Sequence, residues 1–185
     1  MFQKPSKIME VSVAIALIAC GFILRLLPHS PNFAPIGAIA IFSGVYLSSR
    51  KLALLVPVLA MILSDIFLGF YEPTVAVAVY GCFIFSIFLG FLVSKAKKWY
   101  NVLGASLLGS VVFFVVTNFA VWAFAPWYAK TAAGLWQCYL LAVPFFRNTL
   151  LGDLFYAGLF FGSYEVILLG FKLRARQLAT IKIKN

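Results

Sequence analysis

Three polar residues interrupt long apolar stretches of this sequence, and residues of this kind can hold a ligand. Asp65, Asn118 and Asp153 are each flanked on both sides by apolar residues. A polar side chain is costly in hydrocarbon, so it faces a cavity, a partner or a functional site. Carboxylate and amide groups bind the polar atoms of a small organic molecule, while aromatic residues pack against its rings. We therefore expect these residues to belong to a ligand-binding pocket.

Other polar and aromatic residues reach the same depth when the apolar stretches are read as membrane helices. Asp65 then lies about 7–8 Å below the end of its helix, at 1.5 Å per residue. A channel would place polar groups across the whole membrane, whereas a pocket open to one side needs them at one level. The expected ligand-binding residues are His29, Asn32, Asp65, Tyr80, Thr117, Asn118, Trp122, Asn148 and Asp153.

Asp65 and Asp153 also permit a different chemistry. Two aspartates that share a proton on neighbouring membrane helices can activate water for peptide hydrolysis. The Gly152-Asp153 pair resembles the Gly-Asp of intramembrane aspartyl proteases, although Leu150 stands where a G-x-G-D pattern has its first Gly. A membrane enzyme with this aspartyl dyad is therefore an alternative from another functional class.

The chain has three cysteines, Cys20, Cys82 and Cys138, with no C-x-x-C pair and no metal-ligand spacing. A buried cysteine is ordinarily a small apolar residue. A Cys82–Cys138 disulfide and a soft thiolate ligand for a transition metal are two further interpretations. The sequence leaves the choice among these three open.

The composition excludes a water-soluble globular domain. Of the 185 residues, 64% are hydrophobic and 11% are charged, whereas soluble domains have about 25% charged residues. The net charge of +10 does not indicate nucleic acid, because the cations are scattered between apolar stretches. No phosphate loop and no dinucleotide fingerprint is present. We expect a single integral membrane domain over residues 1–185, with any energy supplied by an ion gradient, by trapping or by another polypeptide.

The apolar stretches predict an all-α membrane protein with six transmembrane helices. A further apolar piece at 134–146 contains Pro144 and is too short to span, so it predicts a re-entrant or interfacial helix before the sixth span. A basic tail at 171–185 is expected on the cytoplasmic membrane surface. The predicted spans are 8–27, 33–47, 52–70, 74–93, 102–124 and 149–170.

The Lys and Arg residues predict the orientation of these spans. Of the 15, Arg25, Lys130 and Arg147 fall on one side of the membrane and the remaining 12 on the other. Cytoplasmic loops are enriched in Lys and Arg. Both termini are therefore expected in the cytoplasm, and the candidate binding residues lie toward the outside.

Four motifs carry a resemblance to a known family. They are RLLPHSPNFAPIGA at 25–38, Ser64-Asp65, FFVVTNFAVW at 113–122 and PFFRNTLLGD at 144–153. The chain resembles small bacterial inner-membrane proteins related to the S components of energy-coupling-factor (ECF) vitamin transporters, a group that includes solitary cobalamin transporters. The resemblance implies an S-component-like fold that takes up a vitamin from the outside across the inner membrane.

The resemblance favours cobalamin as the substrate. Cobalamin would then be a bound substrate, and no permanent cofactor is expected. In the cobalamin-transporting relatives, a cysteine near the outer cavity coordinates cobalt and assists decyanation, and Cys82 is the nearest candidate here. Another vitamin or a nucleobase-like precursor is the alternative substrate. A thiol enzyme that modifies a bound corrin through Cys82 is the alternative of another class.

The expected partners include the lipid bilayer and a small-molecule vitamin. The resemblance also implies a protein partner. S components that dock on a shared energising module carry Ala-x-x-x-Ala on the first helix. This chain has Ser12, Ala16 and Cys20 at that spacing instead. Small residues allow close helix contact. The expected partner is an energising module of an ECF transporter, or none if the protein acts alone.

Overall fold

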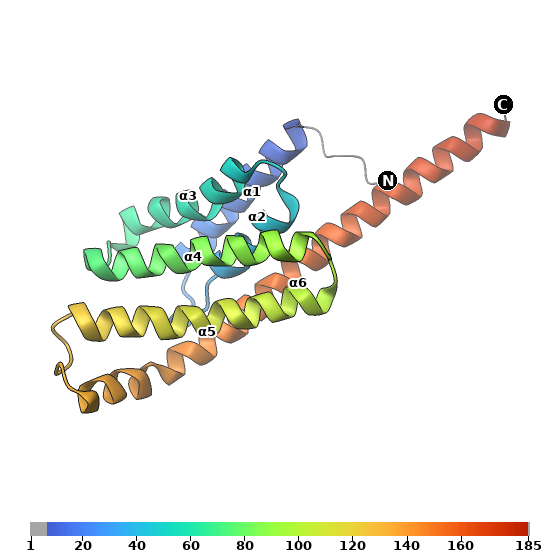
Figure 1. Cartoon of the computed structure of the whole chain (residues 1–185). Helices are drawn as coiled ribbons and strands as arrows, with labels where there is room; N and C mark the ends of the chain where they lie inside the picture. The colour runs from blue at the N-terminus through green and yellow to red at the C-terminus, as the bar shows by residue number, and fades with distance from the viewer. Residues whose placement is uncertain (1–6, 185) are drawn as a thin grey trace.

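The computed structural model describes residues 7–184, and beyond Gly170 it describes the side chains of Leu173 and Arg174 only. These residues form helices and no strand (Figure 1), which confirms the expected all-helical class. Within the described residues, five helices are long and apolar enough to cross a membrane, the pattern of a multi-pass membrane protein. The elements are α1 (Lys7–Leu26), α2 (Ile36–Tyr46), α3 (Arg50–Leu68), α4 (Pro73–Ser94), α5 (Trp99–Phe124) and α6 (Ala132–Lys184).

Helix α2 corrects the prediction of six spans. It has 11 residues, which at 1.5 Å per residue extend about 16 Å, too little for a hydrocarbon core of about 30 Å. The expected helix at 33–47 starts later because Pro35 disfavours a helical residue before it and Asn32 has a positive φ of 65°. Nine of the 11 residues of α2 are nevertheless buried.

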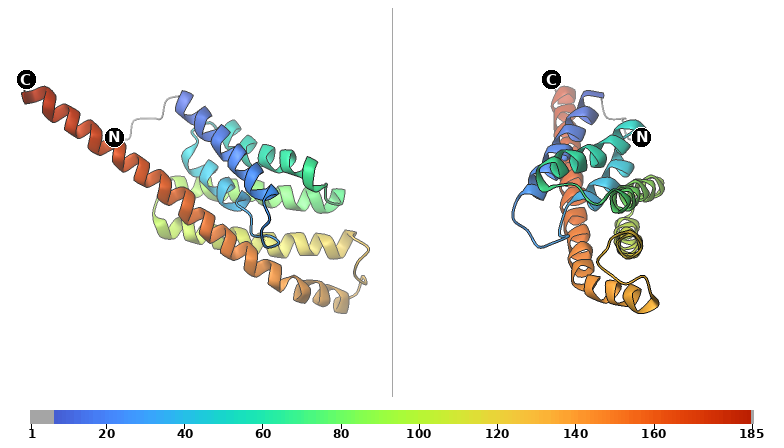
Figure 2. Two further views of the ribbon diagram at one scale, coloured as in Figure 1. Left: turned by 180° about the vertical axis from the view of Figure 1, so that it is seen from behind. Right: turned by 90° about the vertical axis from the view of Figure 1, so that its left-hand side faces the viewer.

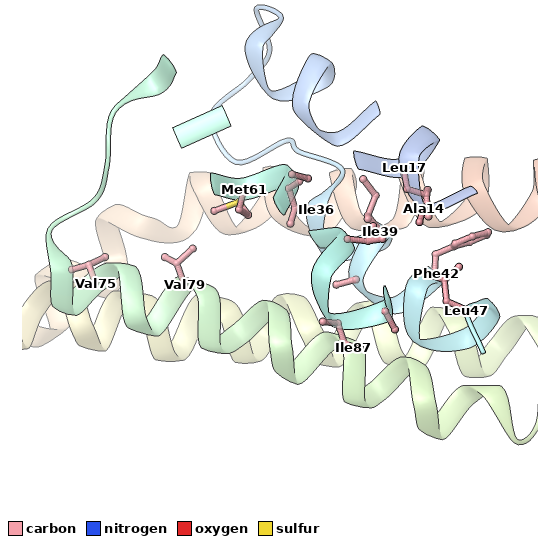
Figure 3. Close-up of a cluster of buried hydrophobic side chains, with 14 of the residues drawn as sticks. Ala14, Leu17, Ile36, Ile39, Phe42, Leu47, Met61, Val75, Val79 and Ile87 are labelled. Atoms are coloured by element: carbon pink, nitrogen blue, oxygen red, sulfur yellow. The ribbon is translucent and has the colours of Figure 1, made fainter. Parts of the chain in front are cut away.

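The core of the protein surrounds α2. Figure 3 shows apolar side chains from α1, α2, α3 and α4 meeting there, among them Ile39, Phe42 and Ile87. The tightest crossing joins α2 to α4, where the Cα atoms of Gly44 and Gly90 face each other. A Cβ on either glycine would overlap the backbone of the other helix. The absence of side chains at these two positions therefore sets the distance between α2 and α4.

The helices alternate in direction, so most of their connections gather at two ends of the bundle (Figures 1 and 2). The connections 69–72 and 125–131 lie at one end, called the cavity end below, and the connection 27–35 lies nearer the middle of the bundle. The connections 47–49 and 95–98 lie at the opposite end, together with the start of α1. Helices α1 and α3 lie on one side of the bundle, and α5 and the first part of α6 lie on the other (Figure 2).

Helix α6 corrects a second prediction. The separate pieces expected at 134–146 and 149–170 form one continuous helix of 53 residues that contains Pro144. If the helix ended inside a membrane, backbone N–H and C=O groups would lack hydrogen-bond partners. The helix therefore continues past Pro144 and changes direction locally. Figure 1 shows such a change in the first part of α6 (orange). The helix continues through the expected basic tail at 171–185 as far as Lys184. The predicted contact of that tail with a membrane surface depends on side chains that lie outside the described part.

The turn between α3 and α4 is fixed by its own residues. Gly69, with φ of 95°, ends α3 in a conformation that side chains rarely adopt. The Glu72 carboxylate then accepts hydrogen bonds from the backbone N–H groups of Thr74 and Val75 at the start of α4. A hydrogen bond from the Thr74 hydroxyl is the main cause that lowers the pKa of Glu72. This turn brings Tyr71 back toward α1.

Candidate ligand-binding cavity

A cavity of about 190 Å³ lies where α2 begins. The non-helical segment 27–35 and the first turn of α2 form part of its wall, and it reaches the surface at His29 and Asn32, which are exposed. Non-helical backbone at membrane depth occurs where it is buried in protein or lines a cavity. The lining residues are Arg25, His29, Asn32, Ala34, Ile36, Gly37, Met61, Leu68, Tyr71, Val79, Phe83, Ser86, Gly109, Phe113, Thr149 and Asp153.

One wall of the cavity carries a buried ion pair. Arg25 of α1 is 9% exposed and Asp65 of α3 is 0% exposed, and 2.8 Å separates Nη1 of Arg25 from Oδ1 of Asp65. The same nitrogen donates to the Ser64 hydroxyl at 2.5 Å, and Nη2 donates to the Tyr71 hydroxyl at 3.3 Å. The Tyr80 hydroxyl donates to Oδ2 of Asp65 at 2.7 Å. Arg25 and Tyr71 thus line the cavity. Asp65 holds Arg25 from behind, and Tyr80 in turn holds Asp65.

The opposite wall carries Asp153 of α6, which is 7% exposed. Its Oδ2 accepts a hydrogen bond of 2.6 Å from the Ser110 hydroxyl of α5. Its carboxylate also lies against Gly37 in the first turn of α2, so closely that a Cβ there would overlap Oδ1. The start of a helix carries a partial positive charge that favours an anion. Among the residues that the structure describes, no cation pairs with Asp153.

Apolar side chains complete the wall between these two polar groups. Phe83 of α4 and Phe113 of α5 lie with ring centroids 5.5 Å apart and planes tilted by 35°. Met61, Ile36 and Val79 lie at the edge of the core beside the start of α2 (Figure 3). A pocket with aromatic walls and a few polar groups suits a small ring-containing molecule.

His29, Asn32 and Asp153 are the sequence candidates that line the cavity. The His29 ring is held by a contact of 2.6 Å between Nδ1 and the carbonyl oxygen of Leu27. Asn148 lies next to the lining residue Thr149, and its amide donates to the Pro31 carbonyl at 3.0 Å. Asn148 therefore attaches the segment 27–35 to α6.

Thr117, Asn118 and Trp122 do not line the cavity. The Thr117 hydroxyl and the Asn118 amide donate to backbone carbonyls one turn earlier in α5. The Trp122 indole N–H donates to the carbonyl of Ala129, in the connection between α5 and α6. In this structure these polar groups donate to backbone acceptors.

The three cysteines are free thiols, so the structure contains no Cys82–Cys138 disulfide. Cys82 is 4% exposed and is not among the residues that line the cavity. The Cys138 thiol donates to the backbone carbonyl of Asn118 at 3.4 Å. In the described part of the chain, no three His, Cys, Asp or Glu side chains lie close enough to hold a metal ion.

Asp65 and Asp153 have separate partners. Both oxygens of Asp65 are engaged, one by Arg25 and one by Tyr80, while Asp153 is bonded to Ser110. A catalytic dyad needs two carboxylates that share a proton. The geometry therefore gives the two aspartates different roles.

Sequence reasoning missed Arg25, Tyr71 and Ser110. Arg25 falls near the end of the first apolar stretch, where the sequence alone predicts an outer loop charge. The available signal was that Arg25 and Asp65 fall at the same depth on two helices, where opposite charges are expected to pair. Tyr71 and Ser110 gave no such signal, because tyrosine and serine are common at membrane surfaces and in membrane helices.

No curated protein and no solved structure matches this chain. A family model matches residues 6–177, which is most of the sequence. The protein therefore belongs to the family described as Family of unknown function (DUF6580).

Proposed function

We propose that the protein takes up a small organic solute of the vitamin class, which it binds in the cavity beside α2, as S components do. The observation that carries the proposal is the cavity itself. It joins a held arginine, a second buried carboxylate and an aromatic wall inside a helical bundle. Such a combination orients a small ring-containing molecule.

The charge distribution supports an outward-facing cavity. Arg50, Lys51, Lys95, Lys97 and Lys98 flank the two connections at the opposite end. At the cavity end, Arg25 is neutralised by its ion pair, which leaves Lys130 and Arg147. Since cytoplasmic loops are rich in Lys and Arg, we place the cavity end outside a bacterial inner membrane and both termini in the cytoplasm.

The cavity volume favours a small substrate. Pockets for drug-sized ligands measure about 300–1,000 Å³, whereas this cavity measures about 190 Å³. A small heterocyclic vitamin or a nucleobase-like precursor therefore fits the cavity better than cobalamin. Cobalamin would require a wider cavity and the exposure of Cys82 as the cobalt ligand.

Release on the other side requires a rearrangement, because the bundle is closed at the opposite end. There the Tyr46 hydroxyl donates to Glu165 at 2.6 Å, and Tyr46, Phe42 and Tyr164 pack together. An energising partner could drive this change. Ser12 and Ala16 are exposed on α1 and Cys20 is half-buried, so this row of small residues offers a face on which another membrane helix can pack closely.

Binding to the purified protein tests the proposal. The unfolding temperature in detergent would be recorded with a panel of small vitamins and nucleobases, and cobalamin would be followed by its absorbance spectrum in wild type and Cys82→Ser. We expect at least one small heterocycle to stabilise the wild type and to lose its effect in Gly37→Ala, which narrows the cavity at Asp153. Trp122→Phe, outside the cavity, is the control. If no member of the panel binds a folded wild-type preparation, the proposal is wrong.

A further inference from the structure

We infer that the molecule bound in this cavity carries a positively charged nitrogen group, such as an amidinium or a protonated amine on a ring, which pairs with Asp153. The inference rests on the proposed function and adds the chemical class of the substrate. It starts from the charge balance of the cavity.

The cavity wall together with Asp65 behind it contains two carboxyl groups, Asp65 and Asp153, and one arginine, Arg25. Arg25 is neutralised by Asp65 at 2.8 Å. Asp153 is then left with a neutral partner, the Ser110 hydroxyl. A buried carboxylate with no opposite charge is costly, and a ligand cation that pairs with Asp153 would compensate that cost.

The other cations at the cavity end do not reach Asp153. Lys130 donates to the backbone carbonyls of Ala125, at 2.6 Å, and of Trp122. Arg147 is exposed and is not among the residues that line the cavity. His29 lies at the mouth, with its ring held by the carbonyl of Leu27.

The neighbours of Asp153 leave one of its oxygens for a ligand. Its carboxylate faces the first turn of α2, where the helix dipole stabilises a negative charge. The Ser110 hydroxyl donates to Oδ2, and Oδ1 has no hydrogen-bond partner among the described residues. Asp153 is 7% exposed and lines the cavity, so Oδ1 is an acceptor that a ligand in the cavity can use.

The shape of the site further narrows the ligand. Phe83 and Phe113 provide aromatic faces, which attract both flat rings and cations. On the opposite wall, Arg25 and Tyr71 offer donors to a hydrogen-bond acceptor. A flat ring with a cationic nitrogen group at one end satisfies both walls.

Three probes of nearly equal shape test the charge preference: benzamidine is a cation, benzamide is neutral and benzoate is an anion. Their dissociation constants would be measured by titration of the purified wild-type protein. We expect benzamidine to bind at least about 10-fold more tightly than benzamide, since hydrogen bonds to charged groups are the stronger ones, and benzoate to bind most weakly. In Asp153→Asn the preference for benzamidine should disappear, whereas Glu72→Gln, at an exposed residue outside the cavity, should keep it.

The possible results separate this inference from the proposed function. If small vitamins bind the wild type but benzamide or benzoate binds as well as benzamidine, the charge preference is wrong and solute uptake stands. If Asp153→Asn retains the preference while its unfolding temperature matches the wild type, Asp153 is not the recognition group. If Asp153→Asn is unfolded, the comparison of benzamidine with benzamide and benzoate in the wild type decides instead. If no probe and no vitamin binds the folded wild type, both proposals are wrong.

Discussion

Arg25 and Asp65 form a buried ion pair that joins α1 to α3, with 2.8 Å between Nη1 and Oδ1. Arg25 lines the cavity, whereas Asp65 lies behind it. The Asp65 carboxylate therefore contributes to the site by holding the Arg25 guanidinium in place.

Asp65→Ala should destabilise the protein strongly. Removing one partner of a buried ion pair leaves the other charge uncompensated, which costs about 3–5 kcal/mol. Tyr80→Phe removes one hydrogen bond from the same carboxylate and should cost about 1 kcal/mol. Unfolding of the two variants in detergent, followed by circular dichroism, measures the difference. Equal stability of Asp65→Ala and wild type would show that the ion pair is not formed.

Gly44→Ala and Gly90→Ala should each destabilise the crossing of α2 and α4. The added methyl group meets the backbone of the other helix, and overpacking of this kind costs about 1–3 kcal/mol. Gly81→Ala is the matched control on α4, because nothing lies within 4 Å of a Cβ at that position. The control should match or exceed the wild type in unfolding temperature, since alanine favours a helix more than glycine does. A Gly44→Ala protein as stable as Gly81→Ala would contradict the close crossing.

Asn148→Ala should loosen the segment 27–35 without unfolding the bundle. The Asn148 amide holds this segment through the Pro31 carbonyl at 3.0 Å, while the helices on either side keep their own contacts. Hydrogen–deuterium exchange should therefore rise at residues 29, 30, 32 and 33 and stay unchanged in α4. Thr149→Val, one residue further along α6, serves as the control, because the Thr149 hydroxyl bonds within its own helix. Unchanged exchange in Asn148→Ala would mean that the segment is held by other contacts.

The sequence was sufficient to predict the helices but not where α2 begins or that α6 is continuous. Apolar stretches report burial in lipid or protein alike, so the run at 33–47 resembled a span although α2 is a short helix in the core. Pro144 ends a helix in water, but within a bundle the helix continues through it.

The candidate site could be predicted only in part, for a related reason. Depth along a helix follows from residue number. The direction in which each side chain points does not follow from depth. Asp153 faces the cavity, whereas Asn118, in the outer part of α5, bonds to its own helix. Only packing between helices separates these two cases.

The placement of the candidate residues predicts unequal effects on ligand binding. Tyr71→Phe removes a hydroxyl that faces the cavity and bonds to Arg25, so it should weaken a bound solute several-fold. Thr117→Val removes a hydroxyl that bonds only to the backbone of α5 and should leave affinity unchanged. Titration of both variants with the tightest ligand of the panel compares them. A larger loss in Thr117→Val than in Tyr71→Phe would place the binding site elsewhere.

The proposed orientation predicts which residues react from outside the cell. Asn32 is exposed at the mouth of the cavity, and Lys97 lies in the connection 95–98 at the opposite end. In a variant with its three native cysteines replaced by serine, Asn32→Cys should react with a membrane-impermeant maleimide in intact cells. Lys97→Cys should react only after the membrane is permeabilised, because the basic end of the bundle remains in the cytoplasm. The reverse labelling pattern would place the cavity on the cytoplasmic side and turn uptake into export.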